Sequence, residues 1–339
     1  LDPKIKNLMS DPCSLSDMRK ASERLIQAVL NKENIIIYAD FDVDGTTSAA
    51  LLIYWLRHNG IDPELYIPDR EQEGYGPNIN AFGKLAKRNK LLLCLDSGTQ
   101  AFESVDTAQK ENCDVIIIDH HHVSSKLPNS FALINPKKEN EDPSFYDLCT
   151  AGIVFLFISD LNRLQRKENK IEFDLINYID LVALATMADV VPLRGLNRAF
   201  IRQGIKMISK NQRPCFEAIA GKANFRSPIT DQALAFTFAP RINAAGRLGD
   251  AKLATKLLTS QNLDQAEKFA NKLEELNIER RTLEQKVFTS ALNQAQIQED
   301  NGEPILWVYD IGWHKGVIGI VAARLKEKFC KPAIVISID

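Results

Sequence analysis

Short apolar runs alternate with longer amphipathic stretches over the first two-thirds of the chain. Three of these runs are rich in Ile, Val or Leu and end in polar residues: IIIYA at 35–39, LLLCL at 91–95 and VIII at 115–118. Such short, uniformly apolar runs are typical of parallel strands that are buried on both faces. Helix-like stretches lie between them, at 46–59 and 100–112. The alternation predicts an α/β fold, with a parallel sheet covered by helices on both faces.

A helix-rich region follows the predicted sheet. Residues 174–187 are expected to form a helix that ends at Asp189, shortly before Pro192. The stretch from 263 to about 298 contains neither Gly nor Pro, and its apolar residues recur at helical spacing. A single helix of this length would span roughly 50 Å and act as a rigid connector. Two helices with an unmarked break are the alternative.

A new strand is expected at 304–309, followed by a Gly-rich loop, a helix and the final strand-like run PAIVISID. We therefore divide the chain into a sheet domain at 1–260, a connecting helix at 261–300 and the start of a smaller α/β domain at 301–339. The chain lacks an initiator Met and stops in a strand-like run, so we expect a piece of a longer protein.

Acidic residues follow each of the three predicted strands. The sequence DFDVDG occupies 40–45, Asp96 follows the second strand, and DHHH occupies 119–122. The carboxyl ends of parallel strands meet at one edge of a sheet, so these residues can converge there. Clustered carboxylates repel one another and need a cation. Oxygen ligands with one or two His suit Mn²⁺ or Mg²⁺. A calcium-binding loop is excluded because Leu51 stands at its twelfth position, where a Glu is required.

Each of these features also has a simpler interpretation when it is taken alone. An Asp after a strand is commonly a turn former or a helix cap. A His run is commonly a solvated loop, but this run is internal and holds three of the five His. Asp189 ends an apolar, helix-like run and could be a turn residue or a further ligand. Their coincidence at successive strand ends favours a metal site.

Composition and charge restrict the classes of protein that are possible. The chain has 339 residues, 45% hydrophobic and 25% charged, which are ordinary values for a globular protein. No apolar run approaches the roughly 18 residues of a membrane span, and the first residues resemble no targeting peptide. Six scattered Cys without a CxxC pair exclude a zinc ribbon and favour reduced thiols in a cytoplasmic protein. The net charge of −2 gives no global basic field for nucleic acid, although an acidic metal site can mask a basic groove.

Four segments resemble, in order, the motifs of the DHH phosphoesterase superfamily: YADFDVDGTTSA, LDSGT, IDHHHV and ALATMADVVPL. Five more resemble the RecJ family of single-strand exonucleases within it: IPDREQEGYG, LINPK, CTAGIVF, PRINAAGRLGDA and GWHKGVIGIVAARL. The similarity covers nearly the whole chain. It implies an α/β fold in which a parallel-sheet DHH domain is joined by a long helix to a smaller DHH-associated domain, with the active site in the cleft between the two domains.

The resemblance also implies two Mn²⁺ or Mg²⁺ ions and assigns residues to them. The implied metal ligands are Asp40, Asp42, Asp44, Asp96, His120 and Asp189. Among them, Asp96 would bridge the two ions. His121 would contact the scissile phosphate or assist at the metal. The predicted catalytic residues are Asp42, Asp44, Asp96, His120, His121 and Asp189. Asp119 is expected to orient a His rather than to bind metal itself.

The substrate would be held by residues from three segments. Arg241, Asn243 and Arg247 are predicted in a loop with small neighbours, where Arg suits phosphate oxygens. An ordinary surface loop is the alternative. The Gly-rich stretch 312–319 precedes a predicted helix and could cradle phosphates. The other predicted substrate contacts are His121, Arg70, Tyr75 for base stacking or simple packing, His314, Lys315 and Gly316.

The resemblance implies a 5′→3′ exonuclease that degrades single-stranded DNA to mononucleotides in recombination and repair. Single-stranded DNA and a single-strand-binding protein are the implied partners, and a monomer is expected. A second enzyme hypothesis is a DHH phosphodiesterase that cleaves short oligoribonucleotides or cyclic dinucleotides. A third is a non-catalytic nucleic-acid-binding scaffold, which the intact set of metal-site residues disfavours.

Overall fold

The computed structural model describes residues 3–338 except 71–72, 75, 168–170 and 211–212. Its main sheet has five parallel strands in the order β2-β1-β3-β4-β5. Their bounds are β1 Ile35–Ala39, β2 Glu64–Tyr66, β3 Leu91–Leu95, β4 Asp114–Ile118 and β5 Ala132–Ile134. The three predicted strands are confirmed. The pattern missed β2 and β5 because each has only three residues, too few to show a period.

The register of the sheet aligns the residues that follow its central strands. Ala39 pairs with Leu95, and Leu95 pairs with Ile118. The hydrogen-bond ladder continues one step further. Asp40 N donates to Leu95 O at 3.2 Å, Asp96 N to Ile118 O at 3.0 Å, and Asp119 N to Ile134 O at 3.1 Å. The first residues after β1, β3 and β4 are therefore all acidic and lie side by side at one edge of the sheet.

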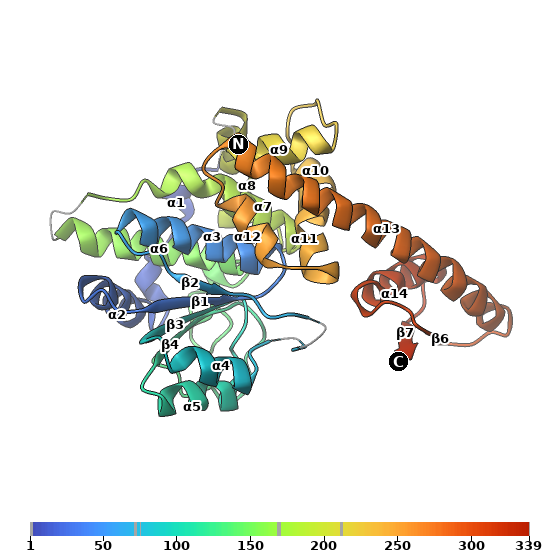
Figure 1. Cartoon of the computed structure of the whole chain (residues 1–339), viewed down its shortest axis with the longest axis horizontal. Coiled ribbons are helices and arrows are strands. Elements are labelled where there is room, and N and C mark those ends of the chain that lie inside the picture. Colours follow the sequence, from blue (N-terminus) through green and yellow to red (C-terminus); the bar gives the residue numbers. More distant parts are fainter. Residues whose placement is uncertain (1–2, 71–72, 75, 168–170, 211–212, 339) are drawn as a thin grey trace.

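Helices cover both faces of this sheet (Figure 1). One face packs against α2 Met18–Leu30, α3 Val43–His58, α6 Thr150–Lys167 and α7 Ile179–Ala188, and the other against α4 Ile79–Ala86 and α5 Phe102–Lys110. Alternate strand residues enter the two cores, so Ile35 and Ile37 face α3 while Ile36 faces α4 and α5. Short turns of helix complete this part: α1 Ile5–Leu8 and the 3₁₀ turns at Pro12–Ser14, Pro143–Phe145 and Leu175–Tyr178. The predicted helix at 174–187 thus begins as a 3₁₀ turn.

A helical layer follows α7 in the chain. It comprises α8 Gly195–Lys210, α9 Pro214–Lys222, α10 Asp231–Ala233, a π-helical segment at Leu234–Phe238, α11 Ala239–Leu248 and α12 Lys252–Leu258. The prediction of a loop that carries Arg241, Asn243 and Arg247 is wrong, because all three lie in α11. Ala, Arg and Leu are strong helix formers. Gly246 serves close packing there, since a Cβ on it would lie 2.6 Å from Phe41 O.

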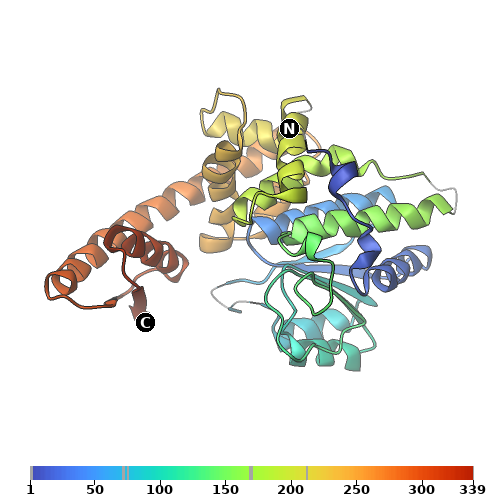
Figure 2. The ribbon, with the colours of Figure 1, turned by 180° about the vertical axis from the view of Figure 1, so that it is seen from behind.

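A single 38-residue helix, α13 Leu263–Asp300, connects this body to a C-terminal unit, so the two-helix alternative is wrong. Its first half packs on the body through Ala266, Ala270 and Leu273. Its second half shares a separate core with β6 Leu306–Ile311, α14 Lys315–Phe329 and β7 Ala333–Ile338. Strands β6 and β7 are parallel to each other. Figures 1 and 2 show this unit at the end of α13 remote from the sheet. The domain limits at 260 and 300 stay predictions. In the described part of the chain, no helix is long and apolar enough to cross a membrane.

The packing of α8 on α7 gives a test of the fold. A Cβ on Gly204 of α8 would overlap Ala183 Cβ and lie 2.8 Å from Ile179 O. Gly204→Ala is therefore expected to lower the free energy of unfolding by about 1–3 kcal/mol in urea titrations.

The matched control is Gly221→Ala in α9, where a Cβ would meet no described atom within 4 Å. This substitution should leave the free energy of unfolding unchanged or raise it by up to about 1 kcal/mol. Equal effects of the two substitutions would contradict the close contact of α7 with α8.

Candidate metal centre

The loop after β1 and the first turn of α3 carry three of the predicted ligands, with Asp40 and Asp42 in the loop and Asp44 in the helix. Asp42 caps α3, and its Oδ1 accepts a hydrogen bond from Gly45 N at 3.0 Å. Gly45 is required by close approach, since a Cβ there would lie 2.5 Å from Asp40 O. The cap and the glycine together fold the loop tightly, so that Asp40 and Asp44 are both buried at the sheet edge.

The amino end of α6 holds two of these carboxylates. Asp44 Oδ2 accepts from Thr150 N at 2.6 Å, and Asp44 Oδ1 accepts from Ala151 N at 2.8 Å. The Thr150 hydroxyl donates to Asp96 Oδ1 at 2.8 Å. Helix amino ends favour carboxylates at this position. Thr150 was not predicted as a site residue, although it lies in the segment CTAGIVF that carried part of the resemblance.

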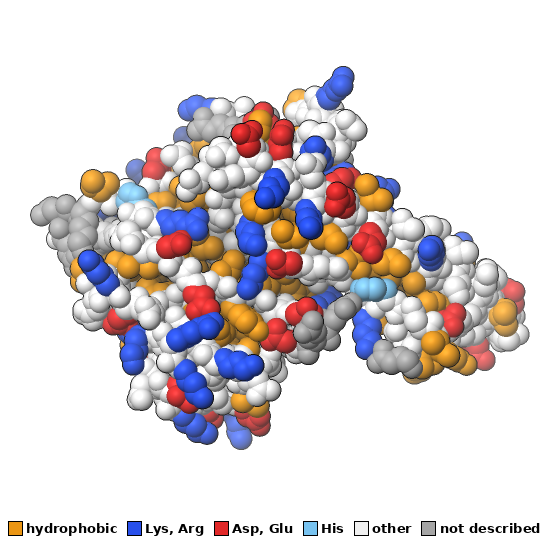
Figure 3. All heavy atoms as spheres, in the orientation of Figure 1, with side chains coloured by type: hydrophobic (Ala, Val, Ile, Leu, Met, Phe, Trp, Pro, Cys, Tyr) orange, Lys and Arg blue, Asp and Glu red, His pale blue; other side chains and the backbone are white. Residues whose placement is uncertain are grey.

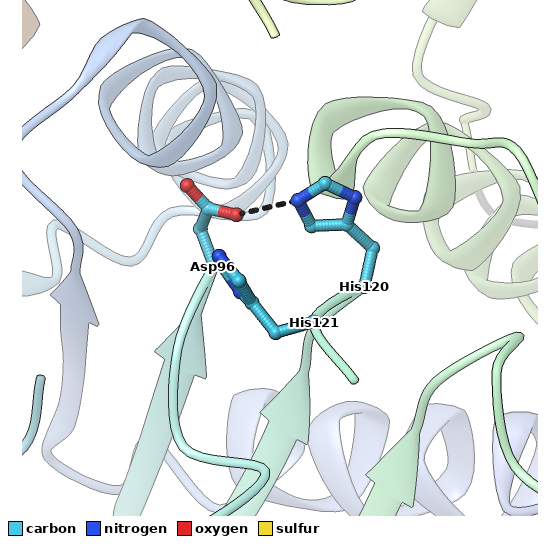
Figure 4. A group of neighbouring side chains, drawn as sticks. All are labelled: Asp96, His120 and His121. Atoms are coloured by element: carbon cyan, nitrogen blue, oxygen red, sulfur yellow. Dashed lines mark ion pairs between the residues drawn. The ribbon is translucent and has the colours of Figure 1, made fainter. Parts of the chain in front are cut away.

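His120 lies between the carboxylates of three different elements. Its Nε2 is 3.5 Å from Asp96 Oδ1, 3.6 Å from Asp189 Oδ2 and 3.9 Å from Asp44 Oδ2. Figure 4 shows the His120 ring facing Asp96, with His121 beside them. Asp189 is the residue that ends α7, as predicted, and it reaches the centre from there.

Three overlapping groups of side chains could each hold a metal ion. They are Asp40, Asp42 and Asp96; Asp44, His120 and Asp189; and Asp96, His120 and His121, each with ligand atoms within 4.8 Å of one another. The structure thus brings together all six residues that were predicted as ligands, and it adds His121 beside them. Asp96 and His120 each belong to two groups, which places them in the middle of the centre.

Burial and mutual repulsion disfavour the ionised forms of the carboxyl groups in this centre. Burial, with the charge of Asp42 as the second cause, raises the pKa of Asp40 to about 7 and that of Asp44 to about 6. Burial and the charge of Asp44 raise the pKa of Asp189 to about 7 and shift the pKa of Asp96 well above its usual range. Such crowding is relieved by a divalent cation.

The donor set fits divalent cations that prefer oxygen. Asp40 Oδ1 is buried and has no hydrogen-bond partner among the residues that the structure describes. A buried carboxylate oxygen without a partner is costly unless a cation meets it. Carboxylate oxygens with one or two imidazoles are typical ligands for Mn²⁺ and also suit Mg²⁺.

Four of the predicted substrate contacts line one cavity of about 440 Å³ between the body and the C-terminal unit: Arg70, Arg247, Lys315 and Gly316. The space-filling view shows the surface hollowed between these two parts (Figure 3). Arg247 bridges them, since its Nη1 donates to Gly316 O at 3.1 Å. The charge of Arg70 acts on Asp40, which places this cavity near the metal centre.

Three other predicted contacts have internal roles in the structure. Arg241 forms an ion pair with Glu274 of α13 at 2.5 Å. Asn243 Oδ1 accepts from Val43 N at 3.0 Å and so braces the loop that carries the acidic residues. His314 caps α14 by accepting from Gly316 N at 3.0 Å. Tyr75 lies outside the described residues.

Comparisons with known proteins place the chain in a family. Residues 34–186 match the model of the DHH family, N-terminal domain. Among curated relatives, the single-stranded-DNA-specific exonuclease RecJ of Bacillus subtilis is 33% identical over 97% of this chain. The RecJ of Escherichia coli is 34% identical over 94% of it. The chain spans only 41% and 58% of these two relatives.

Solved structures agree with this placement. A crystal structure of exonuclease RecJ bound to manganese is 30% identical, with a TM-score of 0.84, and the match covers 95% of this chain and 80% of that one. RecJ from Thermus thermophilus in complex with Mn²⁺ is 28% identical, with a TM-score of 0.83 over 95% of this chain and 46% of that one. The fold is that of a DHH-family protein. More narrowly, the chain belongs to the RecJ family, which confirms the resemblance of the motifs.

The raised carboxyl pKa values predict how stability depends on pH. In the metal-free fold these groups keep their protons up to about pH 6–7, whereas the unfolded chain releases them near pH 4. Their ionisation therefore destabilises the metal-free fold increasingly from about pH 4 to pH 7, and this penalty is absent at lower pH. The stabilisation by Mn²⁺ should grow over the same range.

The measurement is the difference in Tm between the protein in Mn²⁺ and in EDTA, from pH 5 to pH 8. We expect the difference to rise with pH, and calorimetry in buffers of different ionisation enthalpy should show proton release on Mn²⁺ binding. A difference that stays flat or shrinks as pH rises would contradict the account of the centre.

Proposed function

We propose that this protein is a Mn²⁺- or Mg²⁺-dependent exonuclease that degrades single-stranded DNA from the 5′ end to mononucleotides. The observation that carries the proposal is the convergence of six acidic and imidazole ligands in overlapping groups at one sheet edge. The names of the relatives support the substrate, and the Mn²⁺ in related crystal structures supports the cofactor.

The residues of the centre would divide between two ions. Asp40 and Asp42 would hold one ion, Asp44, His120 and Asp189 would hold the other, and Asp96 would serve both. Two such ions, when bound, supply an activated water and neutralise charge on the phosphate that is cleaved. The α6 amino end keeps Asp44 in place through two N–H groups, and Thr150 fixes one oxygen of Asp96.

The cavity beside the centre would hold the DNA backbone. Arg70, Arg247 and Lys315 present positive charge from both sides of the cavity, and Gly316 follows the cap of α14. Contacts to phosphate bind DNA without reading its sequence. This arrangement supports a nuclease that acts on any single strand, and His121 would contact the phosphate that is cleaved.

The second hypothesis is a DHH phosphodiesterase for short oligoribonucleotides or cyclic dinucleotides. It would use the same metal centre. The cavity between the body and the C-terminal unit favours a longer strand, because it adds phosphate contacts beyond the centre. A non-catalytic scaffold is disfavoured by the complete set of ligands.

The biological setting is proposed on the same family basis. We infer a role in recombination and repair, a monomeric state, a cytoplasmic location and a single-strand-binding protein as partner. All six cysteines lie in the described part of the chain and none forms a disulfide, which supports a reducing compartment.

The activity is tested with a long single strand that carries different labels at its two ends. In Mn²⁺ we expect early release of the 5′ label as a mononucleotide, no release from duplex and none in EDTA. First release of the 3′ label would contradict the polarity. Turnover of a dinucleotide without attack on the long strand would favour the second hypothesis.

The role of Asp44 gives a direct test of the centre. Asp44→Asn retains the shape of the side chain but removes the charge that the ion held by Asp44, His120 and Asp189 needs, and it also removes one acceptor for the N–H groups of Thr150 and Ala151. We expect loss of activity by about 10³-fold or more, with an unchanged circular dichroism spectrum. The control is Asp62→Asn, because Asp62 pairs with Arg57 at the surface, at 2.8 Å. Full activity of Asp44→Asn would refute the assignment.

The cavity is tested by the salt dependence of DNA binding. Lys315→Ala should weaken binding of single-stranded DNA for all sequences and reduce the slope of log K against log salt by about 0.7. Lys328→Ala, an exposed position near the other end of α14, is the control and should leave the slope unchanged. Equal slopes in all three proteins would remove Lys315 from the DNA path.

A further inference from the structure

His121 is held by a carboxylate that lies beneath the metal centre. Its Nδ1 is 2.7 Å from Asp119 Oδ1, and the same oxygen accepts from His120 N at 2.8 Å and His121 N at 3.1 Å. An ionised carboxylate can only accept hydrogen bonds, so Nδ1 must carry the proton. Nε2 is then the nitrogen of His121 that can bind a metal when it is unprotonated or donate to a phosphate oxygen when it is protonated.

The second oxygen of Asp119 is fixed by Thr99, which follows β3. Asp119 Oδ2 accepts from Thr99 Oγ1 at 2.6 Å and from Thr99 N at 3.1 Å. Asp119 therefore accepts five hydrogen bonds while it is almost completely buried. These five donors offset the cost of burying the carboxylate and fix both of its oxygens.

Asn135, after β5, completes the chain of hydrogen bonds. The Thr99 hydroxyl has one proton, which it donates in the hydrogen bond to Asp119. Any further partner of Thr99 Oγ1 must therefore be a donor. Asn135 Nδ2 supplies this donor at 3.0 Å and also donates to His121 O at 2.9 Å. Its Oδ1 accepts from Lys137 N at 2.9 Å, which fixes the orientation of the amide. Asn135 is fully buried and uses both ends of its amide here.

We propose that Thr99 and Asn135 are positioning residues that hold His121, through Asp119 and through its own carbonyl, in the orientation in which it meets Asp96 and His120. The proposal rests on the proposed function for its catalytic consequence only. His121 side-chain exposure is 45%, so without this support the ring could turn toward solvent. Figure 4 shows the held orientation, with the three side chains grouped at the ends of β3 and β4.

The chemistry of the network distinguishes isosteric substitutions. Thr99→Ser keeps the hydroxyl, whereas Thr99→Val keeps the shape but removes both of its hydrogen bonds. Asn135→Asp removes both donors and places a second charge near Asp119. Asn197→Asp is the matched control, because the amide of buried Asn197 in α8 also donates two hydrogen bonds, here to the carbonyl oxygens of Asp147 and Pro192 at 2.8 Å and 3.1 Å.

The test combines a spectroscopic and a kinetic measurement. In EDTA-treated, ¹⁵N-His-labelled protein, the Nδ1–H of His121 should give a downfield proton signal, assigned by its loss in His121→Ala. We expect this signal in the native protein, Thr99→Ser and Asn197→Asp. It should move upfield or vanish in Thr99→Val and Asn135→Asp. In Mn²⁺, kcat on single-stranded DNA should fall about 10–100-fold in these last two variants, with KM unchanged.

The outcomes separate this proposal from the proposed function. An unchanged signal in both Thr99→Val and Asn135→Asp overturns the positioning role. So does a loss of kcat in Asn197→Asp as large as in Asn135→Asp, because it would show a merely structural effect. The expected signals in a protein without any nuclease activity would support the network and refute the proposed function instead.

Discussion

The mutual repulsion of buried carboxylates at one sheet edge is the constraint on which this structure depends. Asp40, Asp44, Asp96 and Asp189 are brought close enough that burial and neighbouring charge oppose ionisation of each. A fold that only needed stability would replace such groups with apolar side chains. Their presence together indicates a centre that holds cations, and the catalytic proposal follows from what two cations can do to a phosphodiester.

The rest of the body acts to hold these groups in place against that repulsion. The register of three buried strands sets the first acidic residue of each loop at the same level. The amino end of α6 gives two N–H groups to Asp44, and Thr99 with the histidine backbone saturates Asp119. Neutral hydrogen-bond donors, behind the acidic residues and histidines of the centre, thus hold these side chains in place. Such layers orient ligands and tune their affinity.

The acidic residues of the centre could be predicted from the sequence, whereas the residues that hold them in place could not. Uniform apolar strands and the acidic residues after them predict the sheet edge, because parallel strands share one carboxyl end. Thr150 and Asn135 could not be found this way, since their partners lie 54 and 36 residues away in the chain. The error at Arg241 has a physical reason: small residues that suit a loop also suit a helix packed closely on Phe41.

The long helix gives the cavity beside the centre its second wall, because it carries the unit whose Lys315 and Gly316 line this cavity with Arg70 and Arg247. Whether two metal ions bind at this centre is tested by anomalous diffraction from crystals soaked in Mn²⁺. We expect two manganese peaks, one among Asp40, Asp42 and Asp96 and one among Asp44, His120 and Asp189. A single peak, or peaks only elsewhere on the surface, would contradict a two-metal centre.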